Sequence, residues 1–147
     1  MMTRIVVCSS IAIAGALGSS IVEAQNSLQT SKNPHVAAIE QQIAGKEQQP
    51  AEQVFKDIQV FKGMPAIRVL RIMEMAFNAN LGVDCDHCHS VDDWSSGAKR
   101  QRDIAREMWI LRGEVQEKLR KITGKADLPM TCYTCHKGKA KPAFAPE

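Results

Sequence analysis

Two stretches of the chain place apolar residues at the spacing of an α-helix. The first begins at Gly63-Met64-Pro65, runs to about Asn80 and is followed by Leu81-Gly82. Its stripe consists of Val69, Met73, Ala76, Phe77 and Asn80. The second runs from about Ala98 to Thr123 and is followed by Gly124; its stripe consists of Ile104, Met108, Leu111, Val115, Leu119 and Ile122. Because residues three and four apart share one helix face and glycine readily ends a helix, the pattern predicts two amphipathic helices.

The region before the first helix has weaker patterns. Between Val54 and Lys62 apolar and polar residues alternate, which predicts a short strand or an extended lead-in. The polar, Gln-rich segment 25–52 contains Asn33-Pro34, a pair that can cap a short helix ending near Gly45. A helix and a linker or arm are equally compatible with that segment. The fold class predicted from these elements is mainly α, with few or no strands.

The N-terminal segment 1–24 has the features of a secretory signal peptide. Arg4 precedes an apolar stretch from Ile5 to Leu17, and Ala24 offers a small residue at the cleavage position. A lipoprotein anchor at Cys8 is disfavoured by the large residue that precedes it, and an uncleaved anchor is the remaining alternative. The rest of the chain has no apolar run long enough for a transmembrane helix. We therefore expect a periplasmic protein whose mature chain starts at Gln25.

Each predicted helix is followed by the pattern Cys-x-x-Cys-His, at Cys85–His89 and at Cys132–His136. This pattern is the attachment signature of c-type haem. Two thiols at this spacing reach both vinyl groups of one porphyrin, and the adjacent imidazole binds the iron. The residues assigned to two covalent haem c groups are Cys85, Cys88, Cys132 and Cys135 for the thioethers and His89 and His136 for the irons.

Other uses of these cysteines explain the pattern less well. A structural zinc site would favour a shorter stretch between its two Cys pairs. Two disulfides or a thioredoxin-like centre would not need a His after each second Cys. The organisation predicted is a di-haem domain at residues 53–142 and a short tail at 143–147, in which two helix–turn–Cys-x-x-Cys-His units pack around two haems.

The sixth ligand of an electron-transfer haem is usually Met or His. Met73 and Met108 each lie on the stripe of the helix that precedes a haem motif. A Met on such a stripe is also an ordinary core residue. Met75 lies about 200° further around the helix from Met73, on the polar side, which disfavours it as a ligand without excluding it.

The net charge of the chain is small, but its charged residues are distributed unevenly along the sequence. The chain has 147 residues with 19 Lys and Arg against 16 Asp and Glu, a balance too mild for a nucleic-acid-binding protein. Residues 25–97 contain six basic and nine acidic residues, whereas residues 98–141 contain twelve and five. The basic side chains after the second motif are Lys137, Lys139 and Lys141. A solvated surface and a basic docking rim for an acidic redox partner are both compatible with this layout.

The stretch from Val54 to about Pro142 resembles the cytochrome c subunit of photosynthetic reaction centres. The resemblance lies in Val60-Phe61-Lys62-Gly63-Met64, Arg71-Ile72-Met73, Leu81-Gly82-Val83, Ala105-Arg106-Glu107-Met108 and Thr131-Cys132-Tyr133-Thr134-Cys135-His136-Lys137-Gly138. Photosynthetic members of that family hold four haems in two pairs, whereas this chain has motifs for one pair.

This resemblance implies a ligand set and a function. It implies that Met73 with His89 binds one iron and that Met108 with His136 binds the other. It also implies an exported electron carrier rather than an enzyme, serving protein redox partners such as a membrane redox complex or a reaction centre whose photo-oxidised pigment it re-reduces. The alternative is a haem enzyme or gas-binding protein, such as a di-haem peroxidase with one five-coordinate iron.

Overall fold

The computed structural model describes residues 31–143 and residue 145. The predicted signal peptide at 1–24 lies outside the described residues. The described part of the chain is helical and contains no strand, only isolated bridges between Pro50 and Pro65 and between Ser90 and Asp93. The predicted mainly α fold class is confirmed.

Helix α2, Pro34–Gln42, begins at the Asn33-Pro34 pair noted in the sequence. The Asn33 side chain accepts hydrogen bonds from the backbone N–H groups of His35 and Val36, which satisfies donors that a helix start leaves free. Val36 is 2% exposed and packs in one apolar cluster with Ile43 and with residues of α4. The helical alternative for this stretch is therefore the one that the structure shows.

The prediction of a strand or an extended lead-in between Val54 and Lys62 is wrong. Helix α3, Ala51–Val54, occupies the start of this segment, and the chain then turns at Asp57, whose φ is 60°. A left-handed residue breaks the extended path that a strand needs. The apolar residues Ile58 and Val60 instead pack against a second cluster, whose buried members are Ala51, Phe61, Val69 and Phe77.

The first predicted amphipathic helix is present, with one local change. Helix α4, Ala66–Ile72, continues through a π-helical turn, Met73–Asn78, into α5, Ala79–Leu81. Gly82 follows with φ 63°, in agreement with the predicted glycine stop. A π-turn contains an extra residue and is frequent at functional sites. It begins at the methionine assigned to the first iron.

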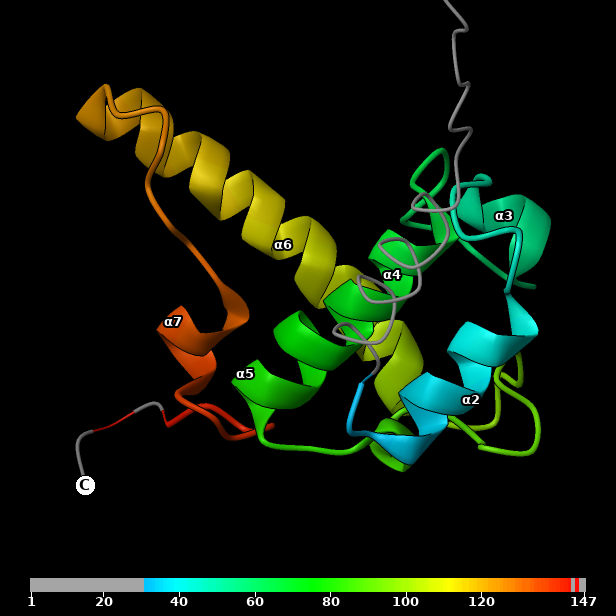
Figure 1. Ribbon diagram of the computed structural model, residues 1–147. Helices are drawn as coiled ribbons and strands as arrows, with labels where there is room; N and C mark the ends of the chain where they lie inside the picture. Colours follow the sequence, from blue (N-terminus) through cyan, green and yellow to red (C-terminus); the bar gives the residue numbers. More distant parts are fainter. Residues whose placement is uncertain (1–30, 144, 146–147) are drawn as a thin grey trace, which may run out of the picture. The chain divides into compact units, whose positions relative to one another are not determined.

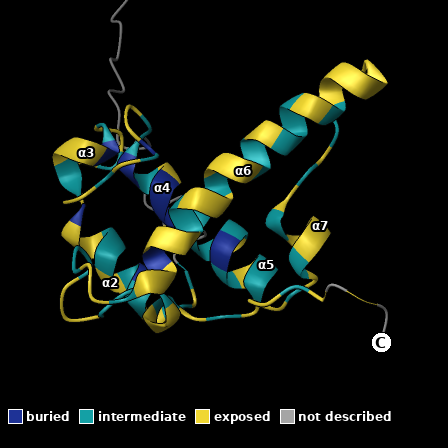
Figure 2. Ribbon diagram, turned by 180° about the vertical axis from the view of Figure 1, so that it is seen from behind, coloured by how far each residue is buried: buried dark blue, intermediate teal, exposed yellow. Residues whose placement is uncertain are grey.

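The second predicted helix is also present, as α6, Arg100–Thr123, followed by Gly124 with φ 69°. One side of α6 packs through Trp109, whose ring lies 4.8 Å from that of Phe61 and 6.1 Å from that of Phe77. The only buried residue of this helix is Arg102. Several residues of its apolar stripe are exposed: Ile104, Met108, Leu111 and Ile122. Figure 2 shows α6 almost entirely in the colours of intermediate and exposed residues.

Both Cys-x-x-Cys-His motifs form short helical turns. Cys85–His87 is a 3₁₀ turn, and Cys132–His136 is helix α7. The chain after α6 doubles back and brings α7 beside α5, the helix that leads into the first motif (Figure 1). The fold thus places the two motifs on neighbouring elements.

Candidate haem sites

The residues assigned to the first haem line one cavity of about 470 Å³. Met73, Cys85, Cys88 and His89 all contribute to its wall, although they come from two different elements. Much of the rest of the lining is apolar and comes from Val36, Ile39, Phe55, Phe61, Val69, Leu70 and Phe77. Met75 does not line this cavity, and its side chain is 67% exposed.

His89 has the tautomer that a metal ligand needs. Its Nδ1 lies 3.0 Å from the carbonyl oxygen of Trp94. A carbonyl only accepts hydrogen bonds, so Nδ1 carries the proton and Nε2 keeps a lone pair for a metal. Burial lowers the pKa of His89, and the nearby charges of Arg102 and Arg106 lower it further. The lowered pKa favours the neutral imidazole, the form that can bind iron.

His136 repeats this arrangement in the second motif. Its Nδ1 lies 3.1 Å from the carbonyl oxygen of Lys139, three residues further along the chain. The same argument gives Nδ1 the proton and leaves Nε2 as the acceptor. Two imidazoles that follow Cys pairs are thus oriented by backbone carbonyls in the same way.

The four cysteines of the motifs are free, with no disulfide among them. Burial raises the pKa of the Cys85, Cys88 and Cys132 thiols, so all three favour the protonated form. The Asn78 side chain donates a hydrogen bond to the Cys85 sulfur at 3.4 Å. Within residues 31–143, no group of three or more His, Cys, Asp or Glu is arranged to hold a metal ion directly.

Two side chains of α6 reach the segment that precedes the second motif. Arg112 donates a hydrogen bond to the carbonyl of Met130 at 3.2 Å, and Gln116 donates one to the carbonyl of Leu128 at 3.4 Å. These bonds tie the segment before Cys132 to the helix that carries Met108. Met108 itself is 46% exposed and is not among the residues lining the first cavity.

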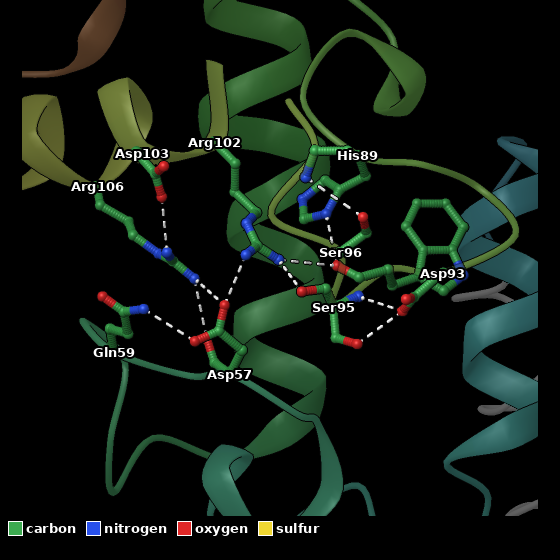
Figure 3. A network of polar contacts seen from close by, with 11 residues as sticks. Asp57, Gln59, His89, Asp93, Ser95, Ser96, Arg102, Asp103 and Arg106 are labelled. Carbon is green, nitrogen blue, oxygen red and sulfur yellow. Dashed lines mark hydrogen bonds and ion pairs between the residues drawn. The ribbon is translucent and has the colours of Figure 1, made fainter. Parts of the chain in front are cut away.

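A polar network borders the first cavity (Figure 3). Arg102 and Arg106 both reach the carboxylate of Asp57, at 2.6 and 2.8 Å. Arg102 is 9% exposed and also donates hydrogen bonds to the carbonyls of Ser95, at 2.6 Å, and Trp94, at 3.4 Å. The Trp94 carbonyl is the one that accepts from His89. Arg102 therefore holds the loop that orients the imidazole.

Sequence patterns missed this network. Arg102 and Arg106 are four residues apart, which places both on one face of α6. This spacing was the one sequence feature that could have indicated a shared partner for the two side chains. Nothing in the sequence indicated their partner, because Asp57 is more than forty residues away in a turn that the alternation had suggested was extended.

The network predicts a pH dependence. Hydrogen bonds from Gln59 and Arg106, and then the charges of Arg106 and Arg102, lower the pKa of Asp57 from 3.8 to about 2. A carboxylate with a lowered folded-state pKa stabilises the fold above its unfolded pKa, and this contribution is lost as the pH falls through about 2. Asp57→Asn should therefore lower the melting temperature at neutral pH, and the difference from wild type should shrink toward pH 2.

Thermal unfolding at a series of pH values checks this expectation. Asp103→Asn is a suitable control, because its carboxylate contacts Arg106 from an exposed position at 2.9 Å. Asp103→Asn should lower the melting temperature at neutral pH by less than Asp57→Asn does. A stability gap for Asp57→Asn that is constant with pH would contradict the prediction.

Two helical turns, each with a Cys pair and an imidazole ready to bind a metal, on a mainly α frame are the features of a c-type cytochrome. Residues 9–145 match the model of the photosynthetic reaction centre cytochrome C subunit family, and the chain belongs to that family. The family is one of electron-carrier subunits, and membership implies covalently bound haem c and protein redox partners. No described helix has the length and apolar character needed to cross a membrane.

Proposed function

We propose that the chain binds two haem c groups covalently and passes single electrons between protein redox partners. The observation that carries this proposal is the shared geometry of His89 and His136. Each donates Nδ1–H to a backbone carbonyl, which leaves the lone pair of Nε2 available to bind a metal. Bound haem supplies an iron that changes between ferric and ferrous states by one electron.

At the first site, Cys85 and Cys88 provide the thioether sulfurs and His89 the proximal ligand. Met73 is the proposed sixth ligand, because it lines the same cavity as these three residues and Met75 does not. The apolar part of the lining would keep water away from a haem bound here. Arg102 holds the carbonyl that orients the imidazole.

At the second site, Cys132 and Cys135 provide the sulfurs and His136 the proximal ligand, with Met108 as the proposed sixth ligand. The exposed apolar stripe of α6 around Met108 supports this ligand assignment. A porphyrin packed on the stripe would cover apolar side chains that are otherwise exposed to solvent. Arg112 ties the segment that precedes this motif to α6.

Two Met ligands favour a carrier over a peroxidase-like enzyme, because both remove the open coordination position that substrate or gas binding needs. Absorption spectra of the ferric protein test this choice. A Met–iron charge-transfer band from both haems supports the carrier. A high-spin signal, or rapid cyanide binding, supports the enzyme.

The number of haems is tested by expressing the full chain with a cytochrome c maturation system. We expect two haems that stay attached in denaturing electrophoresis, because thioethers survive denaturation. The double variant Cys85→Ala/Cys88→Ala should lose one haem, and Cys132→Ala/Cys135→Ala the other. Extraction of both haems by acid acetone from the native protein would overturn the proposal.

The proposed location is the periplasm, after export by the N-terminal segment. The partners are proteins, such as a membrane redox complex or a reaction centre. One docking face is the surface around α7, where Tyr133 is 50% exposed and the Lys137 ammonium lies 5.7 Å from its ring. Lys141 is also exposed there. A basic rim at this point favours an acidic partner.

Electron transfer to an acidic redox protein should therefore slow as salt is added, because salt screens the attraction. Lys137→Glu/Lys141→Glu should lower the rate at low salt and flatten the salt dependence. Lys46→Glu/Lys62→Glu makes the same charge change at two exposed lysines remote in sequence from the second motif. Stopped-flow rates that fall equally in both variants would show that net charge, rather than this face, controls the encounter.

A further inference from the structure

Two glycines at the ends of the motif-bearing elements touch each other. Gly82 ends α5 shortly before Cys85, and Gly138 lies just after α7. Both have left-handed backbones, with φ of 63° and 79°. A Cβ on Gly82 would lie 2.2 Å from the carbonyl oxygen of Gly138. No side chain fits at that distance, so glycine at 82 is what permits the close approach.

Backbone hydrogen bonds extend this contact to both motifs. The N–H of Gly138 donates to the carbonyl of Asn80 in α5 at 3.1 Å. The next carbonyl along the chain, that of Lys139, accepts the Nδ1–H of His136 at 3.1 Å. A three-residue turn thus contacts the helix leading into the first motif and also fixes the proximal imidazole of the second.

The second motif lies beside α5 and is tied to its surroundings at both of its ends. Helix α7 has five residues and none of them is buried. Arg112 ties the chain before Cys132 to α6. The contact after His136 joins α7 directly to the end of α5. This second tie lies close to both motifs, since Cys85 follows Gly82 within one short turn.

We propose that the glycine junction, Gly82 with Gly138, sets the distance and orientation between the two haem-binding motifs, and that electron exchange between their irons depends on it. This inference rests on the proposed binding of two haems. The exchange itself moves one electron, so that one iron is oxidised and the other reduced, and no bond or proton is transferred. The role of the two glycines is positional.

The test compares Gly82→Ala with Gly124→Ala in the haem-loaded full chain. Both glycines follow the last residue of a helix, with φ of 63° and 69°, so alanine strains both backbones alike. A Cβ on Gly124 meets nothing within 4 Å, whereas one on Gly82 meets the Gly138 carbonyl. We expect both variants to keep two haems. Electron exchange between the haems, measured after flash reduction of a half-oxidised sample, should slow several-fold in Gly82→Ala only.

A second measurement uses hydrogen exchange of the Gly138 amide and does not depend on electron transfer. This amide should be protected in wild type and in Gly124→Ala, and should exchange rapidly in Gly82→Ala. Equal exchange rates between the haems in all three proteins, or equal slowing in both variants, would overturn the proposal. So would an unprotected Gly138 amide in wild type. A wild-type protein with a single haem would instead count against the proposed function.

Discussion

Met73→His is expected to lower the reduction potential of one haem and leave the other unchanged. Imidazole donates more strongly to iron than a thioether does, which favours the ferric state, and axial ligands set haem potentials across about 0.8 V. Met73 lines the cavity that contains Cys85, Cys88 and His89, whereas Met108 does not. A redox titration followed by absorption should therefore show one displaced wave. Loss of the Met–iron band from that haem should accompany the shift.

Met75→His is the matched control for this change. It introduces the same imidazole two residues away, at a side chain that is 67% exposed and outside the cavity. Both waves should stay in place. If Met75→His moves a wave and Met73→His moves none, the ligand assignment is reversed.

The haem-free protein is expected to lose cooperative unfolding. The buried apolar residues of the described chain form two small clusters around α2, α3, α4 and the π-turn. Neither α6 nor α7 contributes a buried apolar residue. Fixing each residue of a 24-residue helix costs about 1–2 kcal/mol of backbone entropy, and α6 recovers little of that from protein contacts alone.

Thermal unfolding followed by circular dichroism tests this expectation. The variant Cys85→Ala/Cys88→Ala/Cys132→Ala/Cys135→Ala should melt gradually, with much of α6 already frayed at ordinary temperature. The haem-loaded wild type should unfold in one sharp transition under the same conditions. A sharp transition in the four-alanine variant would mean that the protein core alone is sufficient.

Local patterns predicted the long helices and both motifs, because helical periodicity and the Cys-x-x-Cys-His spacing depend on residues close together in the chain. They did not predict the π-turn at Met73, since a 3.6-residue repeat assumes uniform winding. They gave no sign that α2 contributes Val36 to the wall of the first cavity. A short polar helix has too few apolar residues for its packing partner to be deduced.

The contacts between distant segments also could not be predicted from the sequence. The Asp57–Arg102 pair requires a left-handed residue in a turn, and the contact between Gly82 and Gly138 requires knowledge of where α7 returns. Each joins elements whose approach is decided by the packing of the whole domain.

The contacts of helix α6 limit where this chain could be divided into two separate units. Its first turns supply Arg102 and Arg106 to the loop and cavity of the first motif, and a later turn supplies Arg112 to the segment that precedes the second. The sequence repeats one unit twice, yet cutting between the repeats would separate the first unit from its arginines or the second from its helix. No single cut therefore leaves both motifs with the side chains that contact their surroundings. A piece that keeps these contacts at both motifs must contain α6 together with the segments on either side of it.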